Sequence, residues 1–142
     1  MKLKVFFDSN IIIDGLTCRD YSFKPSRSLL VFAAAQQIKG FITAKQITDI
    51  YYVLKHYFST ESERRRAIKM ICDIFEILPT TKSDIQYCLN TKMKDLEDAL
   101  IDEVCKVNCM DYLVTNNVKD FDGAKSCIAT PEQLVTLLDI NQ

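Results

Sequence analysis

The hydrophobic pattern of the chain alternates between short apolar runs and longer segments with apolar residues at helical spacing. Each short run is three to five residues long and is bounded by polar, glycine or proline residues, which is typical of a buried strand. These runs predict five strands, at residues 4–7, 41–43, 76–78, 111–115 and 127–130.

The segments between these runs predict helices. They lie at residues 11–16, 28–40, 44–58, 61–75, 81–90, 95–108 and from 131 onward. Gly15 is expected to break the first helix and Gly40 to end the second, with a loop around Pro25 between them. Thr130 and Pro131 form a favourable start for the last helix. Short strands that alternate with helices predict an α/β fold, with a central parallel sheet and helices on both faces.

Composition places the chain among globular proteins. Its 142 residues fit a single domain, residues 1–142, and 48% are hydrophobic while 26% are charged. No apolar run approaches the roughly 18–20 residues of a membrane span, and the N-terminus reaches Asp8 too early for a secretory signal. We therefore expect no membrane partner and a cytoplasmic location. The net charge of −1 means that a nucleic acid would have to be held by local basic patches.

The six cysteines do not form a metal-binding pattern. No CxxC pair occurs, and His56 is the single histidine of the sequence, which argues against a zinc site. Most of the cysteines are expected to be small buried hydrophobic residues. His56 is expected on the surface of a helix.

Polar residues follow two of the predicted strands. Asp8 ends the first strand, and Asn116, Asn117 and Asp120 follow the strand at 111–115. Sites in open parallel sheets form at the carboxyl ends of the strands. The two groups would therefore meet if these strands are neighbours.

The segment DLEDALIDE, residues 95–103, combines acidic and apolar residues. Asp95, Asp98 and Asp102 share one face of the predicted helix. Carboxylates about 4–5 Å apart repel by roughly 3–4 kcal/mol at an effective dielectric near 20, so solvent or a cation must neutralise them. Charge at a helix start explains Asp95 and Glu97, and Asp102 could pair with Lys106. Asp98 is harder to explain in this way, because it borders a buried stripe.

Asp49 adds a fourth acidic position. It interrupts a helix between apolar and aromatic residues, although a solvated position would also explain it. Together with Asp8, Asp98 and Asp120 it makes a set of hard oxygen ligands, which suit Mg²⁺ or Mn²⁺. Mg²⁺ sites commonly bind phosphates, so the set suggests phosphate chemistry.

Four motifs resemble those of the PIN domain family of small metal-dependent ribonucleases. They are FFDSNIIID, ITDIYYVL, DLEDAL and LVTNNVKDF, and the resemblance covers almost the whole chain. It implies a three-layer α/β/α fold with about five short parallel strands. It also implies an acidic metal site of Asp8, Asp49, Asp98 and Asp120. Supporting positions carried over in the same way are Asn10, Thr115, Asn117 as a neutral ligand, and Asp102 as an extra contact. One departure is Asp49, where the family usually has Glu.

The resemblance also implies an activity and partners. The expected reaction is hydrolysis of an RNA phosphodiester with Mg²⁺ or Mn²⁺ as cofactor. Many relatives are toxins of VapBC-type toxin–antitoxin pairs, which implies a cognate antitoxin and a homodimer.

RNA would also need a basic surface. Arg64, Arg65, Arg66 and Lys69 form the densest basic run and could contact backbone phosphates. A solvated face paired with Glu61 and Glu63 explains the same run equally well. Three tyrosines at positions 51, 52 and 57 could stack bases or form a dimer interface, but their helical spacing favours the core.

Two alternatives remain open at this point. A receiver-like phosphoacceptor domain is another small parallel α/β fold, but it would need an adjacent acidic pair after the first strand and gives Asp49 and Asp98 no role. A PIN fold that binds RNA or protein without cleavage is favoured only by Asp49 in place of Glu.

Overall fold

A five-stranded parallel sheet forms the centre of the protein. The computed structural model describes residues 2–19 and 23–140. Every neighbouring pair of strands is parallel, and the order is β3-β2-β1-β4-β5. The strands are β1 Lys4–Phe7, β2 Lys39–Thr43, β3 Glu76–Leu78, β4 Tyr112–Val114 and β5 Ile128–Ala129.

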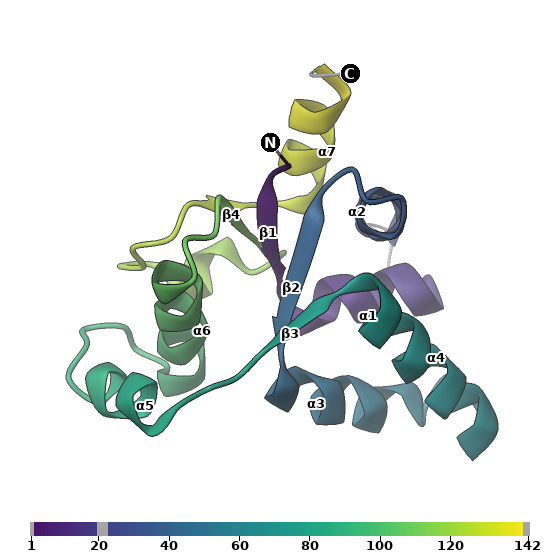
Figure 1. The fold of residues 1–142 in the computed structure, drawn as a ribbon, viewed down its shortest axis with the longest axis horizontal. Coiled ribbons are helices and arrows are strands. Elements are labelled where there is room, and N and C mark those ends of the chain that lie inside the picture. Colours follow the sequence, from purple (N-terminus) through teal and green to yellow (C-terminus); the bar gives the residue numbers. More distant parts are fainter. Residues whose placement is uncertain (1, 20–22, 141–142) are drawn as a thin grey trace.

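Helices cover both faces of this sheet, as the alternating pattern predicts. In Figure 1, α5 and α6 lie on one side and α1, α2 and α4 on the other. The helices are α1 Ser9–Thr17, α2 Phe23–Ala34, α3 Ala44–Leu54, α4 Glu61–Ile74, α5 Lys82–Cys88, α6 Leu96–Val107 and α7 Pro131–Ile140, with a 3₁₀ turn, η1, at Val118–Phe121. No helix within the described ranges is long and apolar enough to cross a membrane.

The alternation of side chains along β1 produces two cores. Val5 and Phe7 face the core shared with α1, α2, α3, α4 and α7, whereas Phe6 faces a smaller core with α6 and η1. All three side chains are fully buried, because helices cover both faces of the strand.

Both glycine predictions are wrong. Helix α1 continues through Gly15 because α2 packs closely there: a Cβ on this residue would lie 2.5 Å from Cδ1 of Leu30. Gly40 lies inside β2 rather than after a helix, and a Cβ there would lie 2.7 Å from the Phe75 ring. Helix α2 also starts earlier than predicted, since Pro25 is accommodated in its first turn, where no backbone donor is needed. Each glycine therefore permits a close contact between elements.

The predicted burial of cysteines and tyrosines is also wrong in part. Cys88 and Cys105 are buried, whereas Cys18, Cys72, Cys109 and Cys127 are exposed. Tyr52 and Tyr57 are exposed rather than part of the core. Helical spacing alone does not determine these positions, because only one face of each helix packs on the sheet. His56 is exposed, as expected.

The strand order excludes the receiver-like alternative. A receiver has the doubly wound order 2-1-3-4-5, in which β1 lies between β2 and β3. Here β1 lies between β2 and β4, and Phe7 pairs with Val114. The residues that follow β1 and β4 are therefore neighbours, as the sequence analysis required for a shared site.

Candidate active site

Asp8 and Thr115 form the centre of the site at the carboxyl edge of the sheet. The Thr115 hydroxyl donates to Oδ2 of Asp8 over 2.7 Å and accepts from the backbone N–H of Asn117 over 3.0 Å. The backbone N–H of Asp8 donates to the carbonyl of Val114. Thr115 is fully buried, so its hydroxyl fixes the orientation of the Asp8 carboxylate. The supporting role expected for Thr115 matches this geometry.

Carboxylates from three elements act on one another at this edge. Burial raises the pKa of Asp8, partly opposed by the hydrogen bond from Thr115, and the charges of Glu97 and Asp120 raise it further. Burial also raises the pKa of Asp98 to about 6, with added repulsion from Asp95, Asp120, Asp8 and Glu97. Asp120 thus acts on both Asp8 and Asp98, and Asp8 acts on Asp98.

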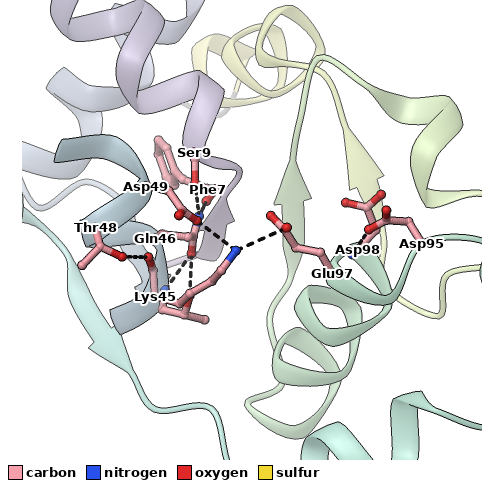
Figure 2. A network of polar contacts seen from close by, with 10 residues as sticks. Phe7, Ser9, Lys45, Gln46, Thr48, Asp49, Asp95, Glu97 and Asp98 are labelled. Atoms are coloured by element: carbon pink, nitrogen blue, oxygen red, sulfur yellow. Dashed lines mark hydrogen bonds and ion pairs between the residues drawn. The ribbon is translucent and has the colours of Figure 1, made fainter. Parts of the chain in front are cut away.

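The acidic residues at the start of α6 have different roles. Asp95 is the N-cap, and its carboxylate accepts from the backbone N–H of Asp98 over 3.0 Å. This confirms the interpretation of Asp95 as a helix-start residue. Glu97 lies in the first turn of α6, as that interpretation requires, but its charge also acts on Asp8 and its side chain reaches toward α3 (Figure 2).

Lys45 bridges α3 and α6 across the mouth of the site. Its Nζ lies 3.0 Å from Oδ2 of Asp49 and 3.3 Å from Oε2 of Glu97, and Figure 2 shows it between the two carboxylates. Partial burial disfavours its charge, but hydrogen bonds to both partners outweigh this effect and leave the pKa of Lys45 raised. The Asp49 carboxylate is thus already paired with a cation from its own helix.

Gln46 joins the start of α3 to the end of β1. Its Nε2 donates to the carbonyl of Phe7 over 2.8 Å and to the hydroxyl of Ser9 over 3.1 Å, while its Oε1 accepts from the backbone N–H of Thr43. This buried amide belongs to the capping box of α3. Sequence reasoning missed Gln46, Lys45 and Glu97 as residues of the site; the pattern T-x-x-Q at 43–46 is a signal for the first of them.

Asn10 does not support Asp8 as the resemblance implied. Its Oδ1 accepts from Nη2 of Arg19 over 2.9 Å, and Nε of the same arginine donates to buried Asp14 over 2.6 Å. Asn116 donates weakly to the other oxygen of Asp14 over 3.3 Å. Asn10 therefore belongs to a network centred on Arg19. Asn117 contributes its backbone N–H at the site, and a role of its side chain as a neutral ligand stays a prediction.

Asp102 holds a loop in this structure, and its role as an extra contact of the metal site stays a prediction. One of its carboxylate oxygens accepts from the backbone N–H of Lys125 over 3.0 Å, and the other accepts from the backbone N–H of Ser126 over 2.9 Å. Its buried side chain thus anchors the loop that follows η1. The shared helical face with Asp98 suggested a shared role, but loop hydrogen bonds occupy both oxygens.

The basic run on α4 is largely neutralised within its own helix. Arg65 pairs with Glu61 at 2.8 Å and Lys69 with Asp73 at 3.1 Å. Arg64 is mostly buried and donates to the carbonyl of Phe58. These contacts agree with the solvated, acid-paired face that the sequence left open. Arg66 is exposed.

The donor set at the carboxyl edge fits a hard divalent cation. The charge of Asp120 raises the pKa of Asp8 and of Asp98, and the charge of Asp8 raises that of Asp98; a divalent cation would offset this repulsion. In residues 2–19 and 23–140, no three acidic, histidine or cysteine side chains already converge as a metal site. Small rotations of exposed Asp120 and half-buried Asp98 would therefore be needed to hold the ion. The fit accordingly rests on donor chemistry and mutual repulsion rather than on a ready-made site.

Comparison with known proteins identifies the family. Residues 4–119 match the family model described as PIN domain. The chain belongs to the PIN domain family. Ribonuclease VapC1 of Aquifex aeolicus (strain VF5) is 27% identical over 138 residues, which cover 92% of each chain.

Several solved structures have a similar fold. A toxin–antitoxin complex from Klebsiella pneumoniae has a chain that matches with a TM-score of 0.66 and 25% identity, over 89% of this chain and 97% of that chain. VapBC2 from Rickettsia felis, bound to a promoter DNA fragment, matches with a TM-score of 0.65 and 15% identity, over 89% and 97% of the two chains. VapC20 from Mycobacterium tuberculosis, a toxin that cleaves the sarcin–ricin loop, matches with a TM-score of 0.61 and 10% identity, over 86% and 95%. The last two likenesses concern the fold alone.

Proposed function

We propose that this PIN domain is a Mg²⁺- or Mn²⁺-dependent ribonuclease and the toxin of a VapBC-type toxin–antitoxin pair. The observation that carries this proposal is the raised pKa of both Asp8 and Asp98, caused first by burial and then by neighbouring carboxylates, with Asp120 contributing to both. Three elements bring these carboxylates to the carboxyl edge of the sheet, where α/β sites form. The similarity to Ribonuclease VapC1 supports RNA as the substrate.

Each residue of the site has a separate task in this proposal. Asp8, Asp98 and Asp120 would hold the ion, and Thr115 keeps the Asp8 carboxylate oriented through its 2.7 Å hydrogen bond. A bound Mg²⁺ or Mn²⁺ supplies Lewis acidity, which lowers the pKa of water and stabilises charge on the phosphate. Lys45 is placed to attract the phosphate backbone toward the mouth of the site. Asp49 would become a ligand only after Lys45 moves to another partner.

The decisive experiment is RNA cleavage with a matched pair of variants. A panel of structured and single-stranded RNAs is incubated with Mg²⁺, Mn²⁺ or chelator. The test variant combines Asp8→Asn with Asp98→Asn, and the control is Asp139→Asn, which removes an exposed carboxylate on α7. We expect metal-dependent cleavage by the wild type and by the control, and none by the double variant. Equal cleavage by all three proteins would contradict the proposed site.

The toxin assignment has its own test. Relatives include a toxin–antitoxin complex, so we propose that a cognate antitoxin binds this chain and that the chain forms a homodimer in the cytoplasm. We expect co-expression of the protein encoded beside this gene to yield a stable complex that no longer cleaves RNA. Light scattering of the isolated chain measures the dimer. A neighbouring protein that neither binds nor inhibits would contradict the toxin assignment, but not the nuclease activity.

A binding module without cleavage is the second candidate, and the Lys45–Asp49 pair favours it. That ion pair neutralises one expected ligand at 3.0 Å. Titration with Mn²⁺ followed by thermal unfolding separates the two functions, because a ligand that binds the folded state raises Tm. No increase in Tm at millimolar Mn²⁺ would favour the binding module over the nuclease.

A further inference from the structure

A pocket of about 360 Å³ lies on α6 beside the acidic cluster. It is enclosed by α6, the end of α5 and the loop after η1, and its volume falls in the range of small-molecule sites. Residues that give it chemical character are Tyr87, Lys92, Glu103, Lys106 and Lys125. The proposed nuclease mechanism uses none of them.

Glu103 is a buried carboxylate in the wall of this pocket. Its exposed fraction is 7%, and its Oε2 has no hydrogen-bond partner among the described residues. A buried acceptor without a partner destabilises the folded state, and more so when it is charged. No ion pair in the described part of the chain joins Glu103 to a pocket lysine. Glu103 therefore carries an unpaired acceptor in the pocket wall, and its side chain must turn toward the pocket for the N–H donors of a ligand to reach this oxygen.

The pocket also has an aromatic and cationic part. Nζ of Lys106 lies 5.1 Å from the centre of the Tyr87 ring, and Nζ of Lys125 lies 5.3 Å from it. Lys125 also donates to the Tyr87 hydroxyl over 2.6 Å. Together with Lys92, which lines the same pocket, these ammonium groups create a positive rim suited to an anion such as a phosphate.

The loop that completes the pocket is held by Asp102. Its carboxylate accepts from the backbone N–H groups of Lys125 and Ser126, and Gly123 supplies the positive φ of 84° that the turn requires. Asp102 is itself buried. The position of Lys125 is therefore fixed by a buried hydrogen-bonded anchor.

We propose that this pocket binds a guanine nucleotide of the RNA substrate. Guanine is the RNA base that presents two adjacent N–H donors, N1–H and N2–H, to a carboxylate such as that of Glu103. Adenine and cytosine place a ring acceptor beside their amino group, and uracil flanks its single N–H with two carbonyls. Tyr87 packs against the nucleotide, and the lysine rim binds its phosphate.

The location of the pocket connects it to the site of cleavage. Ala99, which lines the pocket, directly follows Asp98 in α6. Glu103 is five residues beyond Asp98, roughly 7.5 Å along the helix axis and about 140° around it. A nucleotide next to the scissile phosphate would therefore reach the pocket by following the surface of α6 around the helix. The assignment of the nucleotide to RNA rests on the proposed function, whereas binding of the guanine nucleotide itself does not.

The test measures nucleotide binding to the full chain by calorimetry or NMR titration. The probes are 5′-GMP, 5′-AMP, 5′-CMP and 5′-UMP, and the protein carries Asp8→Asn with Asp98→Asn so that the acidic site is inactive. We expect GMP to bind most tightly, and Glu103→Gln to weaken GMP by about tenfold or more while changing the other nucleotides little. Glu132→Gln on α7 is the matched control. Lys106→Met with Lys125→Met should weaken all four nucleotides.

Three results separate this inference from the proposed function. GMP binding no tighter than AMP binding, or unchanged by Glu103→Gln in a protein of unaltered Tm, would overturn the pocket assignment. If the wild type cleaves RNA but binds GMP no more tightly than the other nucleotides, the guanine assignment of the pocket is wrong while the nuclease function stands. Selective GMP binding by a protein that cleaves no RNA would support the pocket and contradict the nuclease.

Discussion

Asp98 carries a charge that the fold alone does not favour. Burial and four neighbouring carboxylates raise its pKa to about 6. A raised carboxyl pKa means that the folded state binds a proton more tightly than the unfolded chain does. The associated stability is therefore present below the ordinary pKa of 3.8 and is lost as the pH rises through about 6. At neutral pH the metal-free site is a local source of instability, as is common at functional sites.

We predict that Asp98→Asn stabilises the metal-free protein at pH 7.5. The amide removes the repulsion while keeping the shape of the side chain, so Tm measured in chelator should rise. At pH 4 this increase in Tm should disappear, because Asp98 is then largely protonated in the wild type. Scanning calorimetry at the two pH values measures this difference.

Asp139→Asn serves as the control for that comparison, since it removes one exposed negative charge far along the chain on α7. Addition of Mn²⁺ at pH 7.5 should raise Tm of the wild type more than that of Asp98→Asn. A lower Tm for Asp98→Asn in chelator at pH 7.5 would show that the fold does not strain this carboxylate.

Thr115 gives a second prediction at the scale of one residue. Thr115→Val keeps the shape of the side chain but removes the hydroxyl that donates to Asp8 and accepts from Asn117. We expect a loss of about 1–3 kcal/mol in the free energy of unfolding, measured in urea, because both partners lose a buried hydrogen bond. RNA cleavage should fall with it. Thr115→Ser keeps the hydroxyl and should restore cleavage, and equal activity of the Val and Ser variants would contradict the positioning role.

At the scale of elements, hydrogen bonds from the side-chain amide of Gln46 connect the start of α3 to the end of β1. Gln46 belongs to the capping box of α3 and also bonds to Phe7 and Ser9. A second helix provides a comparison: Gln133 of α7 accepts from the backbone N–H of Thr130 in the same capping arrangement, but it is exposed. The difference between the two positions isolates the contribution of the bonds to β1 and α1.

We predict that Gln46→Met destabilises the protein by about 2–4 kcal/mol, because it leaves buried backbone groups without partners. Gln133→Met should cost only about 1 kcal/mol, the usual value of a helix cap. Urea unfolding of both variants measures the two values. Similar losses would mean that Gln46 acts only as a cap and does not couple α3 to the site.

At the scale of the whole molecule, basic residues have two different environments. On α4, Arg64, Arg65 and Lys69 are paired with acids of the same helix, on the opposite side of the sheet from α6 (Figure 1). The lysines beside Tyr87 have no ion pair with Glu103 and border the pocket on α6. The net charge of −1 does not reveal this difference, because it sums the charges of both surfaces.

We predict that RNA affinity depends on Lys106 of α6 and Lys125 of the loop after η1 rather than on α4. In the catalytically inactive Asp8→Asn protein, Lys106→Ala with Lys125→Ala should weaken binding and lower the slope of log K against log salt by about 1–2. The matched double variant Arg65→Ala with Lys69→Ala should change neither. Fluorescence anisotropy with a labelled RNA at several salt concentrations measures both quantities. If the α4 variant weakens RNA binding more than the lysine variant does, the RNA-binding surface lies on the α4 side of the sheet.

The strands and the chemistry of the acidic site are readable from the sequence. Apolar runs place β1 and the other strands because a strand buried on both faces needs consecutive apolar residues. Asp8 and Thr115 follow such runs, and the resemblance to PIN domains singles out Asp98 and Asp120. Helix starts with a local signal, such as Asp95 or Thr81, are also predictable, since a cap acts within one turn.

Tertiary structure decided the partners of each side chain. Gly15 and Gly40 appeared as helix breaks, but they permit close contact with Leu30 and Phe75, residues distant in sequence. Asp98 and Asp102 share a helical face, yet one faces other carboxylates and the other is bound by a loop 23–24 residues further on. Periodicity fixes which side of a helix a residue occupies, whereas the packing of the whole chain determines what lies opposite it.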